Sequence, residues 1–303
     1  MLNNLIASVL PFFPKNLVWL FSKRYIAGES LKDALRVSTN LNSQDLLVTL
    51  DVLGEFETSL DKIEFYKTTY LNTIHETLKA GIKTTYSLKP TMFGLLIDKE
   101  VCYQHIRDIV ELAASNNSFI RIDMEDSKCT DLEIELFKRL FGEFPQHVGL
   151  VLQAYLKRTM EDMMHLNRMN SSQTPVNIRL CKGIYIEPEE ISYKKKLEIN
   201  LHFIDDLEFM LANNFHVAIA THDEALVQAA YKLIDKYKVA KDRFEFQMLY
   251  GVTPELRKTI LQKGYKMRVY VPFGNEWFNY STRRLKENPR MVSDILKALV
   301  VRK

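Results

Sequence analysis

The chain has 303 residues, of which 47% are hydrophobic and 26% charged, a balance typical of a folded globular protein rather than a disordered or fibrous one. Its 41 Lys and Arg residues against 38 Asp and Glu residues leave a net charge of only +3, which argues against a protein that binds nucleic acid through phosphate contacts. Three cysteines without a CxxC spacing predict a reducing compartment and no structural zinc site.

Residues 1–44 are predicted to form a helical arm ahead of the main domain. In the apolar start, MLNNLIASVLPFFPKNLVWLF, Pro11 and Pro14 interrupt the stretch well short of the ~20 residues that a membrane-spanning helix needs. The first basic residue is Lys15, so the basic region that opens a signal peptide is missing. We therefore expect a cytoplasmic protein. An arm packed on the main domain is the simpler interpretation, and a weak peripheral contact of this segment with the inner face of the cell membrane is the alternative.

Over residues 45–303, short β-rich runs alternate with longer amphipathic segments, and no linker rich in Pro, Gly or Ser divides them. The runs are Leu46–Leu50, Ile82–Leu88, Phe119–Met124, Val148–Ala154, Val176–Cys181, His216–Ala220, Phe244–Leu249 and Lys266–Val271. The segments with helical spacing are Leu60–Leu78, Val101–Ala114, Asp131–Leu140, Leu156–Met169, Glu190–Ala212, Glu224–Tyr237, Pro254–Gln262 and Glu276–Leu285. This order predicts one α/β domain, a (β/α)₈ barrel of the TIM type. The first run is not followed by the glycine-rich phosphate loop that an open doubly wound sheet would need.

Polar residues stand at the predicted strand ends, where a barrel of this type carries its chemistry. A single residue of this kind is often only a helix cap, but a full set at one rim indicates a site. Cations outnumber carboxylates there, and Arg283 and Arg284 on the last predicted helix add to them, so we expect an anionic ligand such as a carboxylate or a phosphate. In chain order the strand-end residues are Asp51, Lys89, Asp123, Gln153, Arg179 with Lys182, Thr221 with His222, Gln247 and Tyr270.

The sequence lacks the motifs of several other enzyme classes. The sequence contains no GxSxG and no HExxH motif, and among its seven histidines only His222 follows a strand end, so we expect no metal site. Lys89 at a strand end leaves one alternative open, a lyase that forms a Schiff base with its substrate as barrel aldolases do.

Several motifs in the chain belong to one enzyme family. They are KRYIAGESLKDAL (Lys23–Leu35), VTLDVLGE (Val48–Glu55), RIDMED (Arg121–Asp126), RLCKGIY (Arg179–Tyr185), ATHD (Ala220–Asp223), EFQMLYG (Glu245–Gly251) and RVYVPFGNEWFNYSTRRLKENP (Arg268–Pro289). Over nearly its whole length the sequence resembles the monofunctional proline dehydrogenases, flavoenzymes that oxidise L-proline to Δ¹-pyrroline-5-carboxylate. The resemblance implies a distorted (β/α)₈ barrel with non-covalent FAD and a last helix over the barrel mouth.

The resemblance also implies roles for residues around the substrate carboxylate. Arg283 and Arg284, together with Lys89, would hold the carboxylate, and Glu287 would hold the arginine pair in place. Asp123 would pair with this cationic cluster and hold Lys89 or its neighbours. An amino-acid-binding scaffold without activity is a further alternative, although a scaffold has no need of such a carboxylate clamp.

The resemblance likewise implies which residues contact the proline ring and the cofactor. Tyr270 and Leu249 would line the ring pocket, and Tyr280 lies on the same helix as the arginines. Arg179 would approach flavin N5, and Lys182 the cofactor phosphates or the ribityl chain. The other cofactor positions are Gln153, Gly183, Tyr185, Thr221, His222 and Gln247. We expect a quinone as electron acceptor and a separate pyrroline-5-carboxylate dehydrogenase as the consumer of the product.

The sequence departs from the usual family pattern at three positions. Cys181 and Ile184 stand in RLCKGIY where Val and Ala are usual, and the bulkier Ile184 is expected to change the shape of the pocket. Asp223 stands in ATHD where Asn is usual. Its charge would lie near the cofactor phosphates, or its side chain would cap the following helix, since Asp and Asn are both good N-caps.

Overall fold

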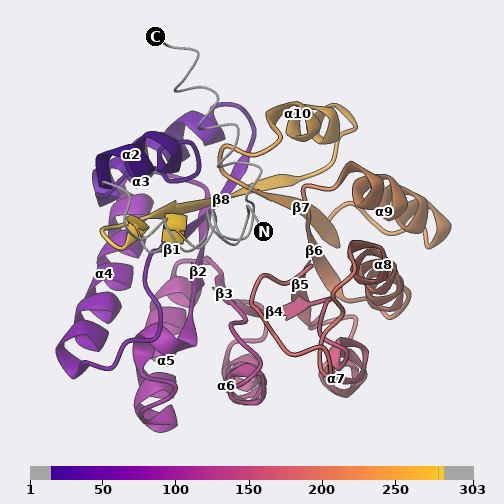
Figure 1. Cartoon of the computed structure of the whole chain (residues 1–303), viewed down its shortest axis with the longest axis horizontal. Coiled ribbons are helices and arrows are strands. Elements are labelled where there is room, and N and C mark those ends of the chain that lie inside the picture. The colour runs from indigo at the N-terminus through magenta and orange to yellow at the C-terminus, as the bar shows by residue number, and fades with distance from the viewer. Residues whose placement is uncertain (1–14, 279, 283–303) are drawn as a thin grey trace, which may run out of the picture.

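The strands form a closed parallel barrel, which confirms the predicted architecture. A computed structural model describes residues 15–278 and 280–282. Each strand pairs in parallel with the next along the chain, and the last closes onto the first (Figure 1). The strands are β1 (Leu47–Val52), β2 (Thr84–Leu88), β3 (Ile120–Ile122), β4 (Val148–Gln153), β5 (Asn177–Cys181), β6 (His216–Ala220), β7 (Phe244–Leu249) and β8 (Met267–Phe273).

The helices surround the barrel because one face of every strand is apolar. On β4, for example, Val148, Leu150 and Leu152 are buried in the same apolar core as Phe137 and Leu140 of the neighbouring helix. Figure 1 shows these helices as an outer ring. They are α4 (Leu60–Lys79), α5 (Lys99–Ser115), α6 (Thr130–Glu143), α7 (Thr159–Leu166), α8 (Lys196–Ala212), α9 (Glu224–Lys236) and α10 (Pro254–Gln262), with the short 3-10 helices η2 (Pro90–Phe93) and η3 (Asn167–Met169).

One predicted helix begins later than its spacing indicated. The segment predicted from Glu190 becomes helical only at Lys196, the start of α8. The residues before it pair with the connection between β4 and α7, where Lys157 N donates to Ile191 O at 2.9 Å and Tyr193 N donates to Tyr155 O at 2.8 Å. These bonds occupy backbone groups that an earlier helix would need for itself, so tertiary pairing overrides the local pattern.

The arm before β1 packs onto the barrel. Its helices are α2 (Lys15–Ser22) and α3 (Leu31–Asn42), and α3 begins with a capping box between Ser30 and Asp33. The buried face of α3 joins the main core, and Ala27 N donates to Pro272 O of β8 at 2.9 Å. Among the described residues, no helix is long and apolar enough to cross a membrane. Of the apolar start, residues 1–21, for which a membrane contact was the alternative, residues 1–14 lie outside the described part of the chain.

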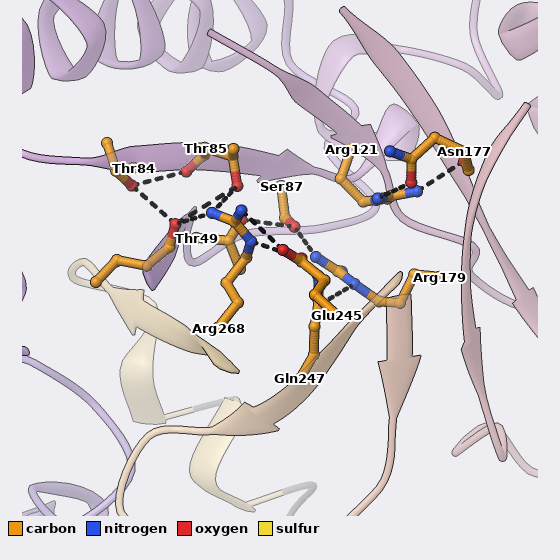
Figure 2. A network of polar contacts seen from close by, with 11 residues as sticks. Thr49, Thr84, Thr85, Ser87, Arg121, Asn177, Arg179, Glu245, Gln247 and Arg268 are labelled. Carbon is orange, nitrogen blue, oxygen red and sulfur yellow. Dashed lines mark hydrogen bonds and ion pairs between the residues drawn. The ribbon is translucent and has the colours of Figure 1, made fainter. Parts of the chain in front are cut away.

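The interior of the barrel is polar. On most strands the residues between the outward apolar ones carry polar side chains, and these meet across the barrel, as Arg179 of β5 does by donating to Ser87 of β2 at 2.9 Å (Figure 2). The small residues Val151 and Ala218 lie opposite Arg179 on the neighbouring strands and leave room for its guanidinium. Barrels of this type are usually filled by branched apolar side chains, so this interior indicates a role beyond packing.

Candidate functional site

A cavity of about 680 Å³ opens at the carboxyl ends of the strands. Every described residue to which the family motifs assign a role lines it, including Tyr280 at the start of the last helix. Asp51 of the strand-end set is fully buried and is not among the residues that line the cavity. Arg283, Arg284 and Glu287 lie outside the described residues. The predicted residues that line the cavity are Lys89, Asp123, Gln153, Arg179, Lys182, Gly183, Tyr185, Thr221, His222, Gln247, Leu249, Tyr270 and Tyr280.

Lys89 is held as a cation. It directly follows β2, and its Nζ donates to Oδ1 of Asp51 on β1 at 2.8 Å, with both residues buried. Burial lowers the pKa of Lys89, but the carboxylates of Asp51 and Asp123 outweigh this effect and raise the pKa above its usual value. A Schiff-base nucleophile needs a neutral amine, so this arrangement suits the binding of an anion better than it suits covalent chemistry.

Asp123, which directly follows β3, joins residues from two other strands. Its Oδ1 accepts from Nη1 of Arg179 at 2.7 Å, and its Oδ2 accepts from the hydroxyl of Tyr270 at 3.0 Å. The guanidinium carbon of Arg179 lies 5.3 Å from the centroid of the Tyr270 ring. Asp123 thus contacts the cationic cluster through Arg179, whereas Asp51 is the carboxylate bonded to Lys89. The sequence placed Asp51 at the rim without a role, although its signal, a carboxylate near a strand end, equals that of Asp123.

Arg179 has a hydrogen-bond partner on each of its three guanidinium nitrogens. Besides the bond to Asp123, Nε donates to Oε1 of Gln247 at 2.6 Å and Nη2 donates to Oγ of Ser87 (Figure 2). Arg179, Gln247 and Tyr270 lie within their strands rather than beyond them, so they reach the cavity from below. Sequence reasoning missed Ser87. Ser87 lies two residues before Lys89, so the alternation of an extended chain points both side chains the same way, which is a usable signal.

A second cationic cluster lies where the cavity meets α8 and α9. Oδ2 of Asp223 accepts from Lys182 at 2.9 Å and from Asn200 at 3.3 Å, and it lies 3.3 Å from Nζ of Lys196. Oδ1 accepts from the backbone N of Ala225 at 3.2 Å, which confirms the predicted cap of α9. Burial raises the pKa of Asp223, but hydrogen bonding and the charge of Lys182 outweigh burial and hold the pKa below its usual range.

Further predicted residues lie at strand ends or in the loops that follow them. Gly183 has a φ of 100°, and a Cβ there would lie 2.0 Å from the Tyr155 ring, so only glycine fits. His222 Nε2 accepts from the backbone N of Leu249 at 2.8 Å, and Gln153 Nε2 donates to the backbone O of Glu125 at 2.8 Å. Ile184 lines the cavity with 43% of its surface exposed. Among the described residues, no group of three His, Cys, Asp or Glu could hold a metal ion.

Comparisons with known proteins point to one family. The family model for proline dehydrogenase matches residues 34–296. The chain is 32% identical to proline dehydrogenase 1 of Bacillus subtilis (strain 168) over 281 residues, and 33% identical to proline dehydrogenase of Deinococcus radiodurans over 287 residues. In both cases the match covers 93% of this chain and 91% of the relative.

A solved structure shows the same fold. The crystal structure of proline utilization A from Bdellovibrio bacteriovorus, inactivated by N-propargylglycine, matches with a TM-score of 0.82 at 28% identity. The match covers 88% of this chain and 32% of that one, so the chain spans about a third of that protein. The bifunctional protein PutA of Escherichia coli is 26% identical, and the chain covers 23% of it.

Proposed function

The chain belongs to the proline dehydrogenase family, and we propose that it oxidises L-proline to Δ¹-pyrroline-5-carboxylate with a non-covalently bound FAD. The observation that carries this proposal is the cavity itself, which is lined by every described residue that the family motifs assign to substrate or cofactor. Its two cationic clusters, around Arg179 with Lys89 and around Lys182, match a ligand pair with a carboxylate on one molecule and phosphates on the other.

The substrate carboxylate would be held by cations from two parts of the chain. Lys89 brings a protonated amine to the cavity, and Arg283 and Arg284 of the family motif would complete the clamp, with Glu287 holding the arginine pair. A bidentate arginine contact limits rotation of the carboxylate and therefore of the ring attached to it. The same positive charge lowers the pKa of the substrate ammonium group, which has to lose a proton before or during the oxidation of its carbon.

The ring of proline would lie against Tyr270 and Leu249, with Tyr280 closing the cavity from the last helix. The hydroxyl of Tyr270 donates to Asp123, so the phenol is held in one orientation. A fixed aromatic wall leaves little room for substituents on the ring, and a substrate hydroxyl buried there without a partner would lose about 1–3 kcal/mol. We therefore propose that the site prefers L-proline over hydroxylated prolines.

The residues present fit FAD. Lys182 and Lys196 bring two cations to one end of the cavity, and the Gly183 backbone reaches the same end in a conformation that other residues rarely adopt. When bound, FAD would accept the two electrons of proline as a hydride at flavin N5 and supply them to a quinone. Arg179, fixed by three partners, places a preorganised positive charge in the cavity, where it would stabilise negative charge that develops during the reaction. The residues proposed to hold FAD are Gln153, Arg179, Lys182, Gly183, Tyr185, Thr221, His222 and Gln247.

The proposal extends to the partners of the reaction. We expect the quinone to be reached through a weak peripheral contact with the inner face of the cell membrane, with the enzyme otherwise cytoplasmic. The product would pass to a separate pyrroline-5-carboxylate dehydrogenase.

The visible spectrum of the purified protein tests the proposal. A flavin band that bleaches when L-proline is added without oxygen is the expected result. A colourless protein that traps a carbonyl substrate after borohydride treatment would indicate a Schiff-base enzyme that uses Lys89. A flavin band that L-proline does not bleach would indicate a binding protein without this activity.

A further inference from the structure

A bidentate ion pair between Glu245 and Arg268 lies inside the barrel, beneath the cavity, and neither residue is among the described residues that line the cavity. Arg268 of β8 donates from Nε and Nη2 to Oε1 and Oε2 of Glu245 on β7, at 2.7 and 2.9 Å (Figure 2). Glu245 is two residues before Gln247, and Arg268 is two residues before Tyr270, so each shares an inward face of its strand with a cavity residue. A buried ion pair is a costly way to fill a barrel, because burying two charges carries a large desolvation penalty.

The ion pair continues into the cavity through one amide. Nε2 of Gln247 donates to Oε1 of Glu245 at 2.6 Å, and Oε1 of Gln247 accepts from Nε of Arg179 at 2.6 Å. A carboxylate accepts hydrogen bonds and a guanidinium donates them, so only one orientation of the amide satisfies both neighbours. If Glu245 were removed, the NH₂ group of Gln247 would lose its buried acceptor. The Gln247 side chain would then have to rotate or shift to reach another acceptor.

Glu245 is well suited to this task. Burial raises the pKa of Glu245, but the guanidinium of Arg268 outweighs burial and lowers the pKa to about 2, so the side chain is an ionised acceptor at neutral pH. Arg268 is itself fixed, since its Nη1 donates to the backbone O of Val48 at 2.8 Å and to Oγ1 of Thr85 at 3.3 Å. These bonds form a continuous hydrogen-bond chain that runs from Arg268 through Glu245 and Gln247 to Arg179 in the cavity.

We infer that Glu245, held by Arg268, is a positioning residue that orients the Gln247 amide and through it fixes the guanidinium of Arg179 in the cavity. The effect of this hydrogen-bond chain on a bound flavin rests on the proposed function, whereas the positioning of Arg179 does not. The prediction is therefore tested first on the protein itself and then on the cofactor.

The direct test is the hydrogen exchange of the Arg179 Nε–H, followed by NMR. The main variant is Glu245→Leu combined with Arg268→Met, which removes the acceptor and leaves no unpaired buried charge. We expect the Arg179 Nε–H to exchange about tenfold faster in this variant, as for the loss of one hydrogen bond. Glu245→Asp, which keeps an ionised acceptor, should retain part of the protection.

A second comparison separates positioning from general loosening of the barrel. Gln247→Leu interrupts the same hydrogen-bond chain in its middle. Adding the Glu245 and Arg268 substitutions to this variant should therefore produce no further change in exchange of the Arg179 Nε–H. Asn177→Ala is the matched control, because it removes a partly buried hydrogen bond of 2.6 Å from Arg121 in the same barrel but none of the bonds that link Arg268 to Arg179. The inference is overturned if exchange is unchanged in the main variant, if its effect adds to that of Gln247→Leu, or if Asn177→Ala has the same effect.

The cofactor readout distinguishes a failure of the inference from a failure of the proposed function. If the protein binds FAD, we expect the main variant to shift the two-electron potential of the flavin to more negative values and to lower kcat more than it raises KM. A tenfold change in the reduction equilibrium corresponds to about 30 mV. Faster exchange with an unchanged potential would support the positioning of Arg179 and overturn its action on the cofactor. A protein that binds no flavin would refute the proposed function and leave the exchange test valid.

Discussion

Replacement of Asp123 by alanine is expected to lower both activity and stability. Asp123 is 9% exposed and accepts from Arg179 and Tyr270 at 2.7 and 3.0 Å. Without it, the guanidinium of Arg179, which is 6% exposed, keeps the neutral partners Gln247 and Ser87. Removing one partner of a buried ion pair costs about 3–5 kcal/mol, and we expect about 3 kcal/mol here because the guanidinium also faces the cavity.

This magnitude can be measured as a shift in Tm. At roughly 2 °C per kcal/mol for a chain of this size, Asp123→Ala should melt about 6 °C below the wild type in saturating FAD. Activity with L-proline at 25 °C, expressed per folded molecule, should fall by about 100-fold or more, because Arg179 and Tyr270 lose their common anchor. Asp123→Asn keeps a hydrogen-bond acceptor but not the charge. Its Tm and its activity should therefore lie between those of the wild type and Asp123→Ala.

A control variant separates the two effects. Asp162 of α7 pairs at 2.8 Å with Arg158, the residue just before that helix. Asp162 is itself buried, but it is not among the described residues that line the cavity. Asp162→Ala should lower the Tm and leave the activity per folded molecule unchanged. The reasoning is refuted if the activity of Asp123→Ala falls only in proportion to its unfolded fraction, since Asp123 would then be a purely structural partner of Arg179.

Other predictions follow from the same site. Arg283→Met and Arg284→Met should each raise the KM for L-proline by about 10- to 150-fold with flavin content retained, and normal proline binding in both would exclude the clamp. The wild type should prefer L-proline over trans-4-hydroxy-L-proline by at least ~10-fold in kcat/KM. Tyr270→Ser should narrow that ratio, and an unchanged ratio would remove Tyr270 from the pocket. Asp223→Asn keeps the helix cap and releases Lys182 toward the cofactor, so titration should show FAD binding about two- to fivefold tighter, and weaker binding would contradict this. Because the pKa of Asp223 is lowered in the folded protein, its contribution to stability is present above the unfolded pKa of about 3.9 and is lost as the pH falls. The difference in Tm between wild type and Asp223→Asn should therefore change below about pH 4 and stay constant above it.

The sequence by itself determined the barrel and the residues at its mouth. Two strands, His216–Ala220 and Phe244–Leu249, have the predicted bounds, because a short apolar run between turn residues is a local signal. The end of each strand is also local information, and parallel strands bring these ends to one face. A list of strand-end residues was therefore enough to place Lys89, Asp123 and Gln153 in one cavity.

The strands carry a second sequence signal, the spacing of their polar residues. Polar residues recur two apart, as in Glu245 with Gln247 and Arg268 with Tyr270, and this spacing predicts a polar face on strands whose other face is apolar. Reading that period would have indicated the polar interior, including the ion pair below the cavity. The spacing does not indicate which carboxylate contacts which cation.

Only the tertiary structure decided the partners. Asp51 and Asp123 have the same sequence signal, yet Asp51 contacts Lys89 and Asp123 contacts Arg179, because the closure and register of the barrel set which side chains meet across it. The start of α8 was decided in the same way, by backbone pairing with a distant loop. Periodicity and residue type are properties of a segment, whereas the choice among several chemically equivalent partners depends on distances between strands that are far apart in the chain.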